Sequence, residues 1–275
     1  MNSLARPAVG AALLAVVLAV HAAQSEQRFP WPRGALAAVS LSYDDALDSQ
    51  LDNALPALDH ARLKASFYLQ LSNPSVRRRM QAWRAAARAG HELGNHTLFH
   101  QCSSALPERA WVAPHRDLLT TSVAQVKDQA LLANTMLLAI DGQRERSFTA
   151  PCGDLKAGGE NYLPSIASEF VAIKAGATDG PVVSMWTLDP YAVPVVAPVG
   201  LGGRELIEMV KAAGASGTML NLTFHGVGGD YLATSAEAHR ELLAFLTANR
   251  KLYWTDTFLN IMKHVKTQQV RRQRR

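Results

Sequence analysis

Short apolar runs alternate with longer amphipathic stretches along most of this chain. Such repetition predicts parallel strands joined by crossover helices, because parallel strands need a helix-length connection. The apolar runs are continuous rather than alternating, which is typical of strands covered on both faces. Strands are expected at residues 35–43, 65–69, 91–97, 147–151, 170–174, 182–188 and 218–225, and helices at residues 49–61, 76–89, 115–140, 204–213 and 236–250. The sequence therefore predicts an α/β architecture with a parallel sheet.

Nothing after residue 30 suggests a second domain, because there is no internal repeat, linker or shift in composition. One domain over residues 30–262 is therefore expected. The chain carries a formal net charge of +5, and much of the basic excess lies in residues 263–275. A terminal basic run is typical of a solvated, disordered tail, with attachment to acidic envelope polymers as the alternative. No basic patch with interleaved aromatics occurs elsewhere, so no nucleic-acid partner is expected.

Residues 1–23 have the features of a secretory signal peptide. Arg6 gives a short basic start, residues 11–20 are almost wholly apolar, and Ala22 and Ala23 offer small residues for cleavage. The apolar stretch is short for a membrane span, and no later segment is long and apolar enough to cross one. We expect a secreted or periplasmic protein with no integral span in its mature chain. An uncleaved N-terminal anchor is the alternative.

The exported chain keeps two cysteines, Cys102 and Cys152. An even pair in an oxidising compartment favours a disulfide, with two free, half-buried thiols as the alternative. If the loops that carry these residues border one site, a Cys102–Cys152 bridge would join the rim of that site.

Residues able to perform chemistry recur where the expected strands end. Asp44 and Asp45 follow the first strand, His96 lies near the end of the third with His100 four residues later, and His225 ends the last. In barrels of parallel strands these ends meet at one face, where catalytic residues gather. One carboxylate and two imidazoles form a usual ligand set for a catalytic zinc, and a second carboxylate beside them can take a proton from water. The pattern predicts metal-assisted hydrolysis.

Each of these residues also has a simpler explanation. The aspartate pair could form a turn or cap a helix. His96 and His100 would project from one face of a helical turn, but this spacing also arises by chance among nine histidines. His225 could be a surface residue with satisfied hydrogen bonds. The remaining histidines of the helical stretches, His60, His115, His239 and His264, are interpreted as structural.

Taken in order, four motifs resemble those of the polysaccharide deacetylase family, the NodB-homology hydrolases. They are Ser-Tyr-Asp44-Asp45, Gly-Asn-His96-Thr-Leu-Phe-His100, Pro151-Cys-Gly153 and Phe224-His225. The resemblance extends from residue 35 to the segment 252–258, hence over nearly all the mature chain. It implies a distorted (β/α) barrel of parallel strands with fewer units than an eightfold barrel. It also implies an acetylated glycan as the partner.

The resemblance assigns a role to each matching residue. Asp44 would be the general base and His225 the general acid. Asp45, His96 and His100 would hold a divalent metal, with Zn²⁺ expected first and Co²⁺, Ni²⁺ or Mn²⁺ also compatible with a mixed nitrogen and oxygen ligand set. The motif Pro151, Cys152 and Gly153 would border the substrate, with a backbone N–H near Cys152 binding the oxyanion.

The chain departs from the family pattern in three places. The family places an arginine, paired with the base, where this chain has Thr149, and Arg146 is the nearest arginine in sequence. The fourth family motif has no clean match, so Trp186 as a pocket wall and Asp189 as the partner of His225 are the nearest candidates. Thr223 replaces a leucine usual two residues before the histidine, which predicts a more polar acetate pocket.

The expected function is an exported, metal-dependent hydrolase that removes acetyl groups, N-acetyl first, from a sugar polymer or oligomer. The bond cleaved would be a carbon–nitrogen bond other than a peptide bond. One alternative is an O-acetyl esterase or small-amide amidase with the same centre. Another is a catalytically silent, carbohydrate-binding relative, which the missing arginine makes credible.

Overall fold

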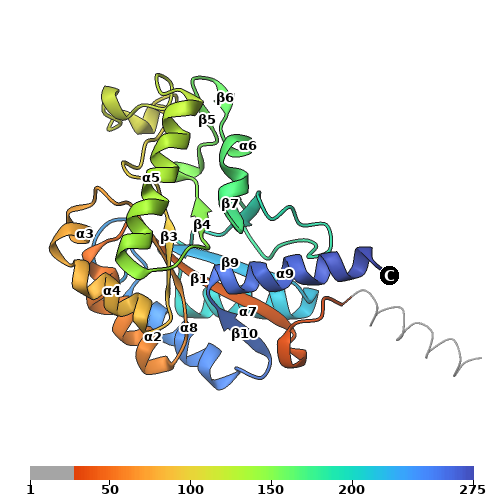
Figure 1. Ribbon diagram of the computed structural model, residues 1–275. Coiled ribbons are helices and arrows are strands. Elements are labelled where there is room, and N and C mark those ends of the chain that lie inside the picture. The colour runs from red at the N-terminus through yellow and green to blue at the C-terminus, as the bar shows by residue number, and fades with distance from the viewer. Residues whose placement is uncertain (1–27) are drawn as a thin grey trace, which may run out of the picture. The chain divides into compact units, whose positions relative to one another are not determined.

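A sheet of eight strands with helices packed around it organises the chain (Figure 1). The structure, a computed structural model, describes residues 28–275, so the predicted signal peptide lies outside the described residues. The strands of the sheet are β1 (Ala37–Asp44), β2 (Ser66–Leu69), β3 (Glu92–Asn95), β4 (Ser147–Thr149), β7 (Ala172–Ala177), β8 (Val193–Val195), β9 (Met219–Phe224) and β10 (Tyr253–Asp256). A separate hairpin joins β5 (Lys156–Ala157) and β6 (Glu160–Asn161). The helices of four or more residues, besides a π-helical turn at Gln50–Ala54, are α2 (Leu55–Ala61), α3 (Pro74–Arg78), α4 (Met80–Arg88), α5 (Val123–Asp141), α6 (Leu163–Ile166), α7 (Gly203–Ser216), α8 (Ala236–Ala248) and α9 (Phe258–Gln273).

The sheet is parallel and almost closed. Its order is β10-β1-β2-β3-β4-β7-β8, and β9 pairs with the other edge of β1. Strands β8 and β9 then meet at a seam, where the Val196 N–H donates to the Asn221 carbonyl at 2.9 Å and the Thr223 N–H donates to the Val196 carbonyl at 2.8 Å. This closure confirms the predicted distorted (β/α) barrel with parallel strands.

Strand β1 lies at the centre of this arrangement, with all its residues buried. Because successive side chains of a strand point to opposite faces, Tyr43 and Asp44 face different surroundings. The Tyr43 ring lies 5.0 Å from the Phe67 ring and 5.5 Å from the Phe224 ring, between centroids. Its hydroxyl lies 2.6 Å from Nε2 of His239 on α8. Tyr43 thus anchors β1 to the helical layer, and Asp44 faces the barrel interior.

Two predicted elements are wrong in position. Residues 182–188 form no strand, because Val183 is 94% exposed and the next strand is instead β8. The long helix α5 begins at Val123 rather than at residue 115, because Ser122 and Gln125 form a capping box there. Strand β10, which pairs with the first half of β1, was not among the expected strands.

The predicted disordered tail is also wrong. Helix α9 runs through the expected boundary at residue 262, and Phe258, Ile261, Met262 and Val265 form its buried face. Their spacing of three and four residues is that of an amphipathic helix. Lys266 Nζ donates to the Val171 carbonyl at 3.0 Å, which holds the basic part of the helix on the protein. Residues Trp31–Arg275 accordingly form one compact unit.

A search of the helices within residues 28–275 finds none whose length and apolar character would let it cross a membrane.

The buried pair of Tyr43 and His239 predicts a pH-dependent stability. Burial lowers the pKa of His239 from 6.5 to about 4, so below pH 6.5 the unfolded chain binds a proton that the folded chain excludes. The contribution of neutral His239 to the free energy of unfolding is fully present above pH 6.5 and is lost as the pH falls toward 4. At about 1.4 kcal/mol per pH unit, the total loss is about 3 kcal/mol. In denaturant unfolding, His239→Gln should lose less stability between pH 7 and pH 4.5 than the parent chain. Equal losses in the two chains would contradict the assignment.

Candidate active site

The carboxyl ends of the strands surround a cavity of about 840 Å³. Its walls include residues predicted to be functional, namely Asp44, Asp45, His96, His100, Cys152, Gly153 and His225, together with Thr149, Lys174, Thr223 and Tyr231. Pro151 is buried and does not line the cavity. The structure therefore gathers most of the predicted site from four strand ends, those of β1, β3, β4 and β9, into one place.

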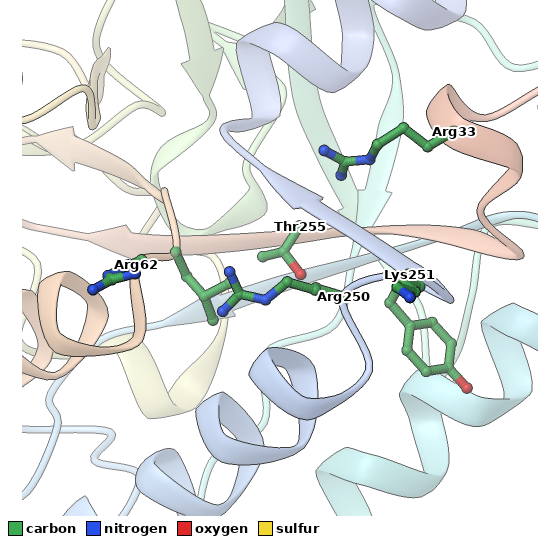
Figure 2. A pocket seen from close by; sticks show the side chains of 7 residues that line it. Arg33, Arg62, Arg250, Lys251 and Thr255 are labelled. Atoms are coloured by element: carbon green, nitrogen blue, oxygen red, sulfur yellow. The ribbon is translucent and has the colours of Figure 1, made fainter.

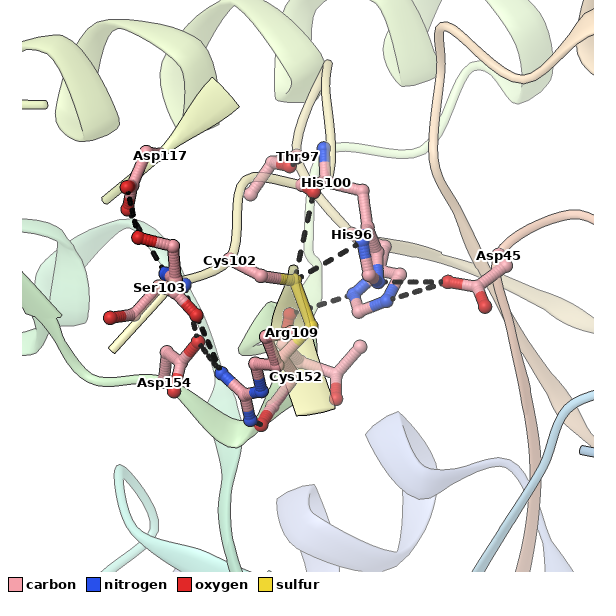
Figure 3. The surroundings of a disulfide bond; sticks show 12 residues. Asp45, His96, Thr97, His100, Cys102, Ser103, Arg109, Asp117, Cys152 and Asp154 are labelled. Carbon is pink, nitrogen blue, oxygen red and sulfur yellow. Dashed lines mark hydrogen bonds and ion pairs between the residues drawn. A yellow bond between two sulfur atoms is a disulfide. The ribbon is translucent and has the colours of Figure 1, made fainter. Parts of the chain in front are cut away.

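Asp45 and the two histidines converge on a single point. Asp45 Oδ1 lies 3.1 Å from Nε2 of His96 and 3.1 Å from Nε2 of His100. Nδ1 of His96 carries a proton, because it donates to the Thr149 carbonyl at 3.0 Å, and in the neutral ring Nε2 presents its lone pair toward Asp45. Figure 3 shows both imidazoles turned toward Asp45. When the imidazoles are neutral, their Nε2 electron pairs and the Asp45 carboxylate face one point, so this donor set fits a divalent metal.

The charge state of the cluster agrees with that fit. Burial raises the pKa of Asp45, but hydrogen bonding and charge from His100 and His96 outweigh it and hold the pKa well below its ordinary value. Burial lowers the pKa of His96, and the two aspartates outweigh that effect and raise it. Asp45 is therefore a carboxylate at neutral pH, which is the form that binds a cation.

The backbone around these ligands is strained. Asp45, Thr97 and His100 adopt left-handed φ values of 81°, 63° and 51°. The Thr97 hydroxyl accepts from the His100 N–H at 3.0 Å, and Asn95 Oδ1 accepts from the Thr97 N–H at 2.8 Å. Residues 96–100 therefore form a bend rather than the expected helical turn. The side-chain hydrogen bonds, not helical spacing, bring the two imidazoles to 4.7 Å between centroids.

Three side chains that contact Asp45 and the strand ends were not foreseen from the sequence. The Tyr231 hydroxyl donates to Asp45 Oδ2 at 2.8 Å. Asn73 Nδ2 donates to the Asp45 carbonyl at 2.9 Å. Gln50 Nε2 donates to the carbonyls of Asp44 and His225, at 2.5 and 3.1 Å, and so ties β1 to β9. These side chains come from loops and turns without a recognisable pattern.

The Asp44 carboxylate is buried beside a lysine. Nζ of Lys174, on β7, lies 3.4 Å from Asp44 Oδ1, and the Thr149 hydroxyl lies 3.4 Å from Oδ2. Lys174 is 1% exposed, and burial lowers its pKa while Asp44 opposes that effect. Arg146 does not reach Asp44, because it pairs with Asp141 and the Leu93 carbonyl. Thr149 supplies no positive charge to Asp44, and Lys174 on the neighbouring strand β7 supplies one instead.

The sequence held a signal for Lys174. It ends the apolar run 170–174, and a lysine in a buried strand needs a counter-charge.

His225 faces the ligand group from β9. Its Nε2 lies 3.9 Å from Asp45 Oδ2, and its buried Nδ1 has no hydrogen-bond partner within residues 28–275. Burial lowers the pKa of His225, although Asp44 and Asp45 oppose the effect. Thr223, two residues earlier, also lines the cavity, and its buried hydroxyl has no partner in that described range.

Trp186 and Asp189 are not part of the site. Asp189 Oδ1 accepts from the Tyr191 N–H at 2.8 Å in a local turn, so it does not support His225. The Trp186 ring lies 4.7 Å from the Arg272 guanidinium carbon, on α9. Neither residue lines the cavity, because the segment that carries them is not the strand expected at 182–188.

The predicted disulfide joins Cys102 and Cys152 beside the cluster (Figure 3). Arg109 reinforces this link, because it pairs with Asp154 and donates to the Cys152 carbonyl at 3.1 Å. His100 lies near both sulfurs, but the disulfide leaves no thiolate for a second metal there. The bridge therefore fixes the loop after His100 to the end of β4.

A second cavity, of about 440 Å³, lies at the amino ends of β1, β2 and β10. Figure 2 shows the basic side chains that line it around β10: Arg33, Arg62, Arg250 and Lys251. It contains no carboxylate or imidazole, so the metal cluster belongs to the other end of the barrel.

The comparisons with known proteins agree with this geometry. Residues 35–165 match the model of the polysaccharide deacetylase family. A search of curated proteins gave no match. A candidate polysaccharide deacetylase from Mycobacterium smegmatis is 18% identical, with a TM-score of 0.61 over 88% of this chain and 94% of that one.

Two further solved structures share the fold. The peptidoglycan deacetylase PdaC from Bacillus subtilis is 18% identical, with a TM-score of 0.51 over 86% of this chain and 96% of that one. A CE4 family pseudoenzyme from Bacillus anthracis is 17% identical, with a TM-score of 0.52 over 82% of this chain and 65% of that one. At such identities the likeness establishes the fold alone.

The fold and the residues at its strand ends define a NodB-type (β/α) barrel with a carboxylate–imidazole cluster at its catalytic face. The stretch at residues 35–165, which carries the aspartate pair and both histidines of the cluster, is the part of the chain that is similar to the polysaccharide deacetylase family. Members of this family are hydrolases that act on acetylated glycans.

Metal binding is the first prediction from this geometry. Calorimetric titration with Zn²⁺ should show one site per chain, and zinc at a hundred times its Kd should stabilise the fold by about 2.7 kcal/mol. His96→Ala should weaken binding by about a hundredfold or more, because it removes one of three ligands. His115→Ala, which removes an imidazole outside the cluster, is the control. Unchanged zinc affinity in His96→Ala would refute the proposed ligand set.

Proposed function

We propose that this chain is a metal-dependent deacetylase that removes N-acetyl groups from a sugar polymer or oligomer. The observation that carries the proposal is the Asp45, His96 and His100 cluster beside a second, buried carboxylate in one cavity. A bound divalent cation, Zn²⁺ in the first instance, supplies the Lewis acidity that activates water and polarises an acetyl carbonyl. Co²⁺, Ni²⁺ or Mn²⁺ would suit the same ligands.

The protein's own groups divide the remaining work. Asp44, held by Lys174 and Thr149, accepts the proton of the attacking water. Tyr231 fixes Asp45 through its second oxygen, so the carboxylate keeps one orientation. His225 gives a proton to the leaving nitrogen, because an amine leaves poorly unless it is protonated. The unpaired Thr223 hydroxyl at the cavity wall can donate to the acetyl group.

Two other functions are compatible with parts of this site. An O-acetyl esterase would use the same centre with less need for His225. A silent, carbohydrate-binding relative has a precedent in the pseudoenzyme from Bacillus anthracis. What favours catalysis here is that the base, the three ligands and the acid are all kept, with Lys174 beside the base.

We also propose that the protein acts outside the cytoplasm, after removal of residues 1–23. The apolar run after Arg6 and the cysteine pair support this. Amino-terminal sequencing of the native protein is the check, and an intact Met1 would contradict cleavage.

Acetate release tests the proposed function. Zinc-loaded protein should release acetate from N-acetylated sugar oligomers and lose that activity in chelator. Asp44→Asn should lower kcat by about a hundredfold or more without weakening zinc binding, because it removes only the base. Faster release from matched O-acetylated oligomers would favour the esterase. Zinc binding and glycan binding without turnover would favour the silent relative.

The Lys174–Asp44 pair generates a second prediction. Lys174→Met should lower kcat by about tenfold to a hundredfold with little change in KM, because Asp44 stays buried without a counter-charge. Adding Thr149→Arg to Lys174→Met should restore part of kcat, since an arginine there can reach Asp44 from β4. Lys211→Met, at an exposed lysine, is the control.

A purely structural role for Lys174 gives a different result. Melting temperature and kcat would then change together, and Thr149→Arg would restore neither of them. The double variant Asp44→Asn with Lys174→Met, a neutral pair, should recover stability that Lys174→Met alone loses.

A further inference from the structure

One arginine on the wall of the catalytic cavity has no counter-charge. Among the described residues, four charged side chains other than histidine line the cavity: Asp44, Asp45, Lys174 and Arg116. Asp44 pairs with Lys174, and Asp45 faces the histidines. Within residues 28–275 no carboxylate lies within ion-pair distance of Arg116, and its Nη1 is buried without a hydrogen-bond partner. A desolvated guanidinium nitrogen without an acceptor is costly, unless a ligand supplies one.

Nearby acids do not reach Arg116 because they are already engaged. Asp117, the next residue, accepts from the Ser104 hydroxyl at 2.5 Å and from the Leu119 N–H at 2.9 Å. Asp154 is paired with Arg109. In the loop after Cys102, Arg109 is therefore engaged in holding the loop, whereas Arg116 lines the cavity.

The fold keeps Arg116 in place. The Leu118 N–H donates to the Cys102 carbonyl at 3.0 Å, and Cys102 is fixed by the disulfide. The guanidinium carbon lies 4.0 Å from the centre of the Phe99 ring, so the planar group stacks on an aromatic face. Phe99 precedes the ligand His100 directly, which places the guanidinium next to the cluster. A guanidinium packed against a ring has fewer conformations to lose when it binds a carboxylate through two hydrogen bonds.

An exposed aromatic ring completes this part of the wall. Trp111 lines the same cavity and is 63% exposed. An exposed indole offers a flat apolar face with a polar edge, which suits the face of a sugar ring. An anion on a sugar and the sugar ring itself would thus each meet a suitable group beside the reaction centre.

We infer that Arg116, stacked on Phe99, forms a subsite for a carboxylate carried by the glycan, on a sugar next to the one that loses its acetyl group. The inference rests on the proposed function for its setting, because it names the substrate class of the same cavity. The preferred substrate is an acidic acetylated glycan rather than a neutral one. The chain's net charge of +5 favours approach of such a polymer.

A matched pair of substrates tests this subsite. One is an acetylated oligosaccharide with a free carboxylate, and the other is the same oligosaccharide with that carboxylate converted to an amide. In assays of acetate release, kcat/KM should be about tenfold or more higher for the carboxylate form. The difference should come from a lower KM, with kcat nearly the same for the two substrates. Arg116→Gln should abolish the preference by lowering kcat/KM for the acid about tenfold to a hundredfold and leaving the amide within about twofold.

Further variants separate charge from geometry. Arg116→Lys should keep only part of the preference, because an ammonium lacks the planar pair of donors. Arg240→Gln, an equal loss of charge on exposed α8, should change neither substrate. Equal rates on both substrates in the parent chain, or equal losses on both in Arg116→Gln, would overturn the inference. The inference would also be overturned if the enzyme preferred a sulfated oligosaccharide but showed no preference for the carboxylate form over the amide form.

Calorimetry separates failure of this inference from failure of the proposed function. Binding of the carboxylate oligosaccharide to Asp44→Asn protein should weaken about tenfold or more when Arg116→Gln is added. That result without acetate release from any substrate would reject the deacetylase and keep the subsite. Acetate release without the preference would reject the subsite and keep the deacetylase.

Discussion

The rest of the structure depends on one constraint: strand β1 is paired on both edges and completely buried. Its two edges are shared by β9, β10 and β2, so every residue of the strand is buried. Two carboxylates therefore enter the barrel at the end of a strand that cannot move toward water. Buried carboxylates need partners, and the neighbouring strand ends supply them. Imidazoles from the end of β3 face Asp45, and the ammonium of β7 faces Asp44.

A chain of close contacts links packing to chemistry on the side of Asp44. Position 94, on β3, accepts only glycine, because a Cβ there would lie 2.4 Å from the Tyr68 ring. Tyr68 can therefore lie flat across β3, and Nζ of Lys174 sits 4.1 Å above its ring. The Tyr68 hydroxyl meets Ser147 at 2.7 Å, and Ser147 in turn donates to the buried Glu92. The Lys174 ammonium thus lies against the Tyr68 ring as well as Asp44, and the charge of Glu92 helps to raise its pKa against the effect of burial.

Much of the fold and most residues of the cluster could be predicted from the sequence, for identifiable physical reasons. Continuous apolar runs marked β1, β2, β4 and β9, because a strand covered on both faces has no polar side. Asp44, Asp45 and His225 could be found because they lie at the ends of such runs, and His96 and His100 because two histidines four residues apart are a recognisable pair of metal ligands. The closing seam at Val196, the bend at residues 96–100 and the pairing of Lys174 with Asp44 could not be found. They depend on hydrogen bonds and contacts between segments far apart in the chain. Helix α9 was readable from the spacing of Phe258, Ile261 and Val265, but the basic residues around them obscured it.

The position of the lysine on β7 affects how relatives of this chain can be recognised. Residue 174 lies beyond the stretch 35–165 that the family model covers. A survey that demands an arginine at position 149 would discard this sequence as inactive, and would do the same to any homologue with the same exchange. Sorting such sequences by the charge that lies next to Asp44 in three dimensions, instead of by the residue at position 149, would keep them as candidates for activity tests.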